Sequence, residues 1–217
     1  MIRSVLIALD GSPSSQVALR LAIRNLKKRF AAPEGEAPVS LTGIAVLDRP
    51  TIAGPEPVPP GGGAFKRERD EQLIQQADEK TQQILQEFAA TCQSESVACA
   101  TIRANGHPRD AITAASRTHD LIVIGRDSNF HYPGQADDDP CQTFKLLVRD
   151  HPCPVIVTPR DEPEGSACVV AYDGSLAASR ALHMFAMMEP SVADLTVHVV
   201  AVHRDRPQAE ALSLIHI

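Results

Sequence analysis

The sequence carries a carboxylate and a hydroxyl directly after an apolar run. Residues 5–9 are all apolar, and Asp10, Gly11 and Ser12 follow them. Ligands of open α/β sheets bind beyond the carboxyl ends of the strands, where the Asp10 carboxylate can accept from ribose hydroxyls or an adenine amine. Asp10 can equally satisfy backbone donors within its own turn, because Asp is a common turn residue. The sequence leaves both roles open.

The motifs of several enzyme classes are missing. The chain has no GxxxxGK[ST] or GxGxxG loop for phosphate, no GxSxG nucleophile elbow and no HExxH zinc spacing. Its five cysteines are odd in number and form no CxxC pair, which favours reduced thiols in a cytoplasmic protein over disulfides or zinc. We therefore expect no catalytic residues, no metal site and a cytoplasmic location.

The composition and net charge of the chain limit the kinds of partner that we expect. The chain has 217 residues, of which 43% are hydrophobic and 22% charged, and its net charge is −6, as in ordinary soluble globular proteins. The excess of negative charge argues against a nucleic-acid partner, because phosphate backbones require a basic surface. No apolar run approaches the roughly 20 residues of a membrane span, and the first residues lead straight into a strand. We expect neither nucleic acid nor membrane as partner.

Strands alternate with helices along the chain. Ser12 is the predicted N-cap of the first helix and Pro13 its first residue. A Pro- and Gly-rich loop, 49–63, is expected to hold no single conformation. Further strands are predicted at 41–47, 97–104, 121–124 and 154–158, and further helices at about 65–91, 106–116 and 141–149. Such alternation implies right-handed βαβ crossovers. The predicted fold class is α/β, a Rossmann-like, doubly wound five-stranded parallel sheet with helices on both faces.

The opening pattern is repeated near the end of the chain. Asp173, Gly174 and Ser175 again follow an apolar run and precede a helix, at a constant offset from the first copy. The second copy runs only strand, helix and strand, with nothing to cover its edge. We expect a domain over 1–159, a linker over 160–167, and an incomplete second copy of the domain over 168–211.

The last six residues, 212–217, read LSLIHI. They are what CTG-TCT-CTT-ATA-CAC-ATC encodes, a transposon end used in preparing sequencing libraries, so we expect a non-native tail. The alternative is a genuine apolar tail, since short apolar ends occur on exposed termini.

Four segments together resemble one known family. VLIALDGS, GHPRDAI, DLIVIG and LLVRDHPCPVIVTP are similar to those of the universal stress protein family, over residues 1–159 and again from 167 to about 204. The resemblance implies a stress-response protein in which two domains of one chain substitute for a homodimer. It also implies self-association, or pairing between the two domains, through the strand at 154–158.

The resemblance also implies a nucleotide site, and the sequence departs from it. The family's ATP-binding members use an Asp after the first strand, backbone after the second, and a G-x2-G-x9-G-[ST] stretch. The candidate cofactor-binding residues carried over here are Asp10, Val46, Gly125, Ser128 and Thr143. Ser128 replaces the second glycine and Cys141 the third, while Asp137, Asp138 and Asp139 add negative charge to the same loop. We therefore expect ATP to bind weakly or not at all.

Three functions remain open. The leading hypothesis is a non-catalytic stress-response protein that acts through self-association or partner binding. The first alternative is a nucleotide-binding regulator that holds ATP or AMP. The second is an ATP-dependent adenylating enzyme, which the sequence disfavours because DGSPSS has too few glycines for an SGGxDS-type pyrophosphate loop.

Overall fold

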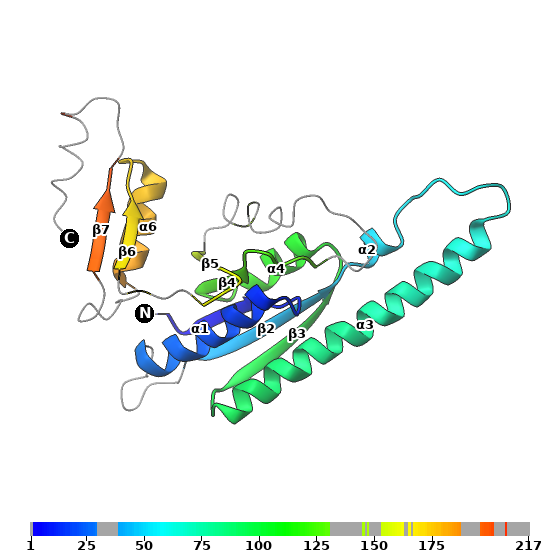
Figure 1. The fold of residues 1–217 in the computed structure, drawn as a ribbon, viewed down its shortest axis with the longest axis horizontal. Coiled ribbons are helices and arrows are strands. Elements are labelled where there is room, and N and C mark those ends of the chain that lie inside the picture. Colours follow the sequence, from blue (N-terminus) through cyan, green and yellow to red (C-terminus); the bar gives the residue numbers. More distant parts are fainter. Residues whose placement is uncertain are drawn as a thin grey trace. The chain divides into compact units, whose positions relative to one another are not determined.

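The protein is described from a computed structural model (Figure 1), which covers residues 2–29, 39–130, 145, 147, 153–162, 165, 167–187, 196–201 and 207. The chain divides into two compact units, Ile2–Glu162 and Pro163–Ile217. Each is described by itself. None of the helices in these residues has the length and hydrophobicity that a membrane crossing requires.

The first unit is built on a parallel sheet of five strands. They are β1 (Ser4–Ala8), β2 (Ser40–Leu47), β3 (Cys99–Asn105), β4 (Leu121–Gly125) and β5 (Val155–Thr158). Their order is β3-β2-β1-β4-β5, and every neighbouring pair is parallel. This confirms the predicted fold class. The order reverses beside β1, the point where ligands of open α/β sheets bind.

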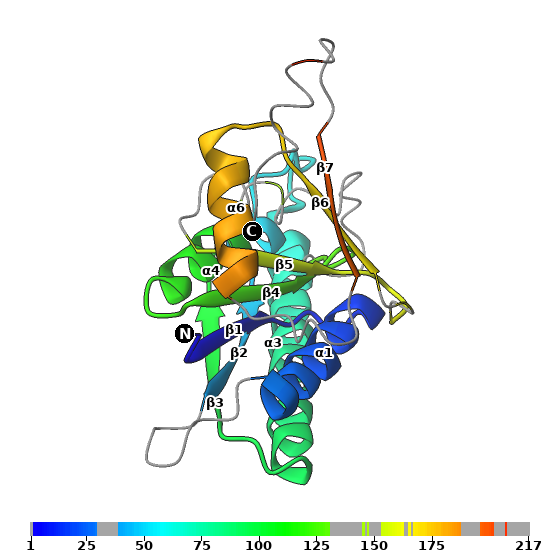
Figure 2. The ribbon, with the colours of Figure 1, turned by 90° about the vertical axis from the view of Figure 1, so that its left-hand side faces the viewer.

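Helices cover both faces of this sheet (Figure 2). Helices α1 (Pro13–Arg29) and α3 (Gly63–Ser94) pack on one face, and α4 (Pro108–Ser116) packs on the other. A Cβ on Gly43 of β2 would lie 2.8 Å from the ring of Phe88. The glycine therefore lets α3 approach the sheet closely.

The core between α4 and the sheet is built of apolar side chains from both. Leu6, Ile44, Ile112 and Ile124 are almost completely buried in it. At about 25 cal/mol per Å² of apolar surface removed from water, such side chains contribute roughly 1.5–3 kcal/mol each. The predicted helix at 141–149 lies outside the described residues except for positions 145 and 147.

The Pro- and Gly-rich loop departs from its prediction. It begins with a short helix, α2 (Arg49–Ile52), whose N-cap is Asp48. Asp48 accepts from the Thr51 amide at 3.1 Å and from the Thr51 hydroxyl at 2.6 Å. Further along, Arg69 of α3 donates to both carboxylate oxygens of Glu56, at 3.1 and 2.5 Å, and lowers the pKa of Glu56. The expectation of no fixed conformation was wrong for residues 49–56, because these polar side chains hold that part of the segment.

The second unit repeats the start of the first. Strands β6 (Ala167–Ala171) and β7 (Thr196–Val200) pair in parallel, and α6 (Leu176–Met187) lies between them in sequence. Asp173 accepts from the Ser175 amide at 2.9 Å, and the Ser175 hydroxyl accepts from the Ala178 amide at 3.1 Å. Within the described residues, β6 has only β7 as a neighbour, whereas β1 lies between β2 and β4.

One face of the second sheet has no described helix over it and carries exposed apolar side chains. Val169 and Val200 are 66% and 43% exposed, while their counterparts Leu6 and Ile44 in the first unit are fully buried. In the first unit both positions lie beneath α4, and Leu6 also pairs with β4.

Candidate functional site

Asp10 lies at the carboxyl end of β1 and is 9% exposed. Its Oδ1 accepts from the Ser12 amide at 3.1 Å and from the Ser12 hydroxyl at 2.6 Å. The hydroxyl of Ser128 donates to the same oxygen at 3.3 Å. Its Oδ2 accepts from the backbone N–H of Asn129 at 2.6 Å. The carboxylate thus ties the turn after β1 to the segment that follows β4.

The local sequence builds this turn. Gly11 has φ +79°, a conformation that side chains disfavour. The Ser12 hydroxyl accepts from the amide of Ser15 at 3.2 Å, and α1 begins at Pro13. The predicted N-cap and the predicted proline at the first helical position are both confirmed.

Gly125 lies where β4 meets the first turn of α1. A Cβ at this position would lie 2.4 Å from Ser14 Oγ and 2.8 Å from the Ser14 carbonyl carbon, closer than real Cβ atoms come. The Thr158 hydroxyl donates to the Ser14 carbonyl at 2.9 Å, which joins the end of β5 to the same turn. Packing therefore requires a glycine here whether or not a phosphate binds.

A small cavity lies behind Asp10. Its volume is about 10 Å³, and its lining includes Asp10, Val46, Thr81 of α3 and Asn129. This is about the space that one water molecule needs.

The structure brings together four of the five candidate cofactor-binding residues. Asp10 and Val46 line the same cavity, Ser128 touches Asp10, and Gly125 adjoins Ser128. Thr143 lies outside the described residues, as do Cys141 and Asp137, Asp138 and Asp139. The binding role of these residues stays a prediction.

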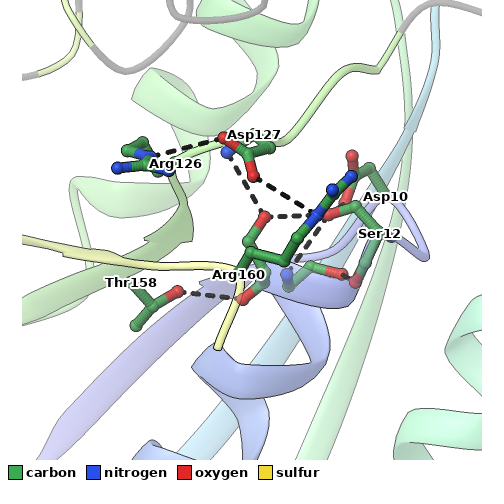
Figure 3. A network of polar contacts seen from close by, with 8 residues as sticks. Asp10, Ser12, Arg126, Asp127, Thr158 and Arg160 are labelled. Carbon is green, nitrogen blue, oxygen red and sulfur yellow. Dashed lines mark hydrogen bonds and ion pairs between the residues drawn. The ribbon is translucent and has the colours of Figure 1, made fainter. Parts of the chain in front are cut away.

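Two arginines lie at the rim of the site around Asp127 (Figure 3). The Arg126 Nε is 3.4 Å from one Asp127 oxygen, and the Arg160 Nε is 3.8 Å from the other. The Asp127 amide donates to Ser14 Oγ at 3.3 Å, so the rim is joined to the turn below. Both guanidinium groups are exposed and lie beside the Asp127 carboxylate.

Sequence reasoning missed three residues of this arrangement, Ser14, Asn129 and Thr158. Asn129 reaches Asp10 through its backbone N–H, so its side-chain type carries no signal. Ser14 is fully buried, and a second serine directly after a helix N-cap is the hint that was available for it. The described residues contain no group of three or more acidic, His or Cys side chains that could hold a metal ion.

Comparisons with known proteins give the family. The sequence model of the Universal stress protein family matches residues 1–131. A universal stress protein from Archaeoglobus fulgidus has a similar structure, with a TM-score of 0.63 and 18% identity, covering 97% of this chain and 70% of that one. The universal stress protein UspA from Lactobacillus plantarum has a TM-score of 0.46 and 21% identity, and the match covers 72% of this chain and 97% of that one. A universal stress protein family protein from Arabidopsis thaliana, solved with AMP bound, has a TM-score of 0.46 and 15% identity, and the match covers 73% of this chain and 92% of that one. A search of the curated proteins finds no match.

The archaeal protein supports the fold alone, because its identity to this chain is low. The match to the family model is stronger evidence of kinship, because it spans more than half of the chain. The matched residues include the turn at Asp10, and also Val46 and Ser128. The chain belongs to the universal stress protein family.

Proposed function

We propose that this protein is a non-catalytic, cytoplasmic stress-response protein that acts through self-association or partner binding, without binding ATP. The observation that supports this proposal is that hydrogen bonds from the protein itself already engage both oxygens of the Asp10 carboxylate. One carboxylate oxygen accepts from Ser12 and Ser128, and the other accepts from the Asn129 amide. The carboxylate that would bind ribose or adenine is already engaged by its own chain.

The space beside Asp10 supports the same proposal. Pockets for ligands of nucleotide size usually enclose about 300 Å³ or more, whereas the cavity that Asp10 itself lines encloses about 10 Å³. A larger cavity of about 280 Å³ is lined by Leu9 and Gly11 but not by Asp10. A ligand would have to separate Asn129 from Asp10. A hydrogen bond to a charged group is worth about 1.5–3 kcal/mol, so that separation alone weakens binding about tenfold to a hundredfold.

Calorimetric titration of ATP, with and without Mg²⁺, tests this proposal. We expect no dissociation constant at or below ~10 μM in either titration. Ser128→Gly is the matched variant, because it restores the second glycine of the family motif but leaves the Asn129 contact in place; it too should not bind. A tighter constant for the wild-type protein would refute the proposal.

Strand β5 supports self-association. The Pro154 carbonyl accepts from the Ile122 amide at 3.0 Å, and the Thr158 carbonyl accepts from the Arg126 amide at 2.8 Å. In a parallel ladder the residues between such acceptors turn their backbone groups to the other side. The backbone groups of Val155 and Val157 therefore point to the edge of the sheet that has no partner strand among the described residues. Their side chains pack instead at the rim of the apolar core. An unpaired apolar edge is a template for pairing with another strand.

Light scattering of two lysine variants tests this edge. We expect the wild-type protein to be larger than one chain and Ile156→Lys to reduce its mass. Thr101→Lys is the matched control, because it places the same charge on β3, the opposite edge strand, and should leave the mass unchanged. Circular dichroism verifies that both variants are folded. A monomeric wild-type protein, or an unchanged mass for Ile156→Lys, would contradict the proposed surface.

A nucleotide-binding regulator is the second candidate, favoured by the two guanidinium groups, of Arg126 and Arg160, that lie beside the site. Guanidinium groups bind phosphate in a forked geometry, and a monophosphate needs fewer donors than a triphosphate. Titration of AMP separates the candidates. Micromolar binding of AMP that Arg160→Gln weakens about tenfold would favour the regulator, and absence of heat would favour the non-nucleotide proposal.

A further inference from the structure

The buried stripe of α3 ends in a cysteine. The side chains that α3 turns toward the sheet recur every three or four residues and are all buried: Ala77, Thr81, Leu85, Phe88 and Cys92. Cys92 is fully buried, in the last turn of the helix. Its sulfur therefore lies between the helix end and the sheet.

The strand that follows begins with another cysteine on the same side. Ile102 and Ala104 of β3 pack against the core on the α4 face. Because side chains alternate along a strand, Cys99 and Arg103 face α3, and Arg103 forms an ion pair there with Asp78 of α3. Cys99 is exposed.

The connection between helix and strand brings the two sulfurs together. The Val97 amide donates to the Cys92 carbonyl at 2.9 Å, and Ser96 takes the left-handed conformation with φ 57°. This tight turn returns the chain to the helix end. Both thiols therefore lie at the same end of the space between α3 and β3, and the Cys99 sulfur is near enough to contribute to the raised pKa of Cys92.

We propose that Cys92 and Cys99 are a reversible dithiol–disulfide site that a hydroperoxide oxidises. The Cys99 thiolate attacks one peroxide oxygen, the O–O bond breaks, and hydroxide leaves as Cys99 becomes a sulfenic acid. The Cys92 sulfur then attacks the Cys99 sulfur, the S–S bond forms, and the hydroxyl group leaves as water with the Cys92 proton. Both thiols are oxidised and one hydrogen peroxide is reduced. The site is independent of the proposed function.

The environment of each sulfur sets this order. Cys99 is exposed, so peroxide reaches it first. Burial, with a further contribution from the neighbouring Cys99 sulfur, raises the pKa of Cys92 to about 12. Cys92 is thus a protonated thiol at neutral pH, and thiols react with peroxide much more slowly than thiolates. Its role is to resolve the sulfenic acid of its neighbour.

Peptide mapping of the full chain tests the proposal. The reduced protein is treated with hydrogen peroxide, alkylated and digested with trypsin, and both cysteines fall in one peptide, Thr81–Arg103. We expect this peptide to lose two hydrogen atoms, to take up no alkyl group, and to regain both alkylation sites after treatment with dithiothreitol.

Trapping with dimedone, a reagent for sulfenic acids, separates a resolved pair from a singly reactive thiol. Cys92→Ala should accumulate about tenfold more dimedone adduct on Cys99 than the wild-type protein, because nothing resolves the sulfenic acid. Cys153→Ala is the control, since it removes a half-buried thiol elsewhere in the same unit, and should behave as wild type. If Cys92→Ala does not fold, the wild-type peptide alone decides. A doubly alkylated peptide after peroxide treatment, a disulfide to a second chain, or equal dimedone adducts in wild type and Cys92→Ala would overturn the proposal.

Discussion

Gly125→Ala tests whether the glycine is held by packing. The added Cβ would lie 2.4 Å from Ser14 Oγ, 2.7 Å from Ser128 Oγ and 2.8 Å from the Ser14 carbonyl carbon. A hydroxyl can rotate away, but the carbonyl carbon belongs to the first turn of α1 and moves only with the helix. Overpacking of this kind costs about 1–3 kcal/mol. For a chain of this size that lowers the Tm by roughly 2–12 °C.

Thermal and urea unfolding followed by circular dichroism measure this cost. Gly63→Ala is the matched control, because its Cβ would come no closer than 3.7 Å to another residue, at the Arg67 guanidinium; its stability should stay within ~0.5 kcal/mol of wild type. Adding Ser14→Ala to Gly125→Ala removes the hydroxyl contact but not the contact with the carbonyl carbon, so only part of the loss should return. A loss below ~0.5 kcal/mol for Gly125→Ala would refute the packing argument.

Three further predictions follow from the same contacts. Asp10→Asn should lower the free energy of unfolding by about 1–3 kcal/mol, because an amide cannot accept from all of these donors, while the exposed counterpart Asp173→Asn should cost less than ~0.5 kcal/mol in the same urea titration. Burial raises the pKa of Asp120, but the hydrogen bonds from the backbone amides of Arg3 and Ser4 outweigh it and hold the pKa below its ordinary value. The ionised Asp120 therefore stabilises the folded state fully above the unfolded-state pKa, and this stabilisation is lost as the pH falls through the lower folded-state pKa. Asp120→Asn should thus lower the urea midpoint at ~pH 7 and converge on wild type as the pH falls below the folded-state pKa of Asp120, and a constant difference would contradict this. Peroxide-treated protein should gain up to ~2.5 kcal/mol in urea unfolding from the eight-residue loop closed between its two oxidised cysteines, and no gain in a fully oxidised sample would contradict the estimate.

The sequence was most informative where the determinant is local. The apolar runs of the strands, the Ser12 cap and the repeat at Asp173 depend on residues close in sequence, and all three were predicted. The segment around Glu56 was not, because its order depends on Arg69 in the next helix. A count of prolines and glycines contains no information about that partner.

The sequence predicted where the candidate site lies, but not whether the Asp10 carboxylate is available to a ligand. Parallel strands end at one edge, so the topology alone brings Asp10 and Gly125 together. Whether Asp10 is available to a ligand depends on the backbone N–H of Asn129, which is far away in sequence. A backbone donor is common to all residue types except proline, so no sequence pattern identifies this one.

The exposed apolar face of the second unit has a consequence for how the two copies open. An amide in the middle of β1, at Leu6, lies between two strands and beneath a helix, so its exchange with deuterium requires the cooperative unfolding of the whole first unit. The corresponding amide at Val169 lies in a strand with one described neighbour and an exposed apolar face, so a local opening suffices. Two segments that share one sequence pattern should therefore differ by orders of magnitude in protection. That difference would measure, within a single chain, how much cooperativity a βαβ unit gains from α4 and β4.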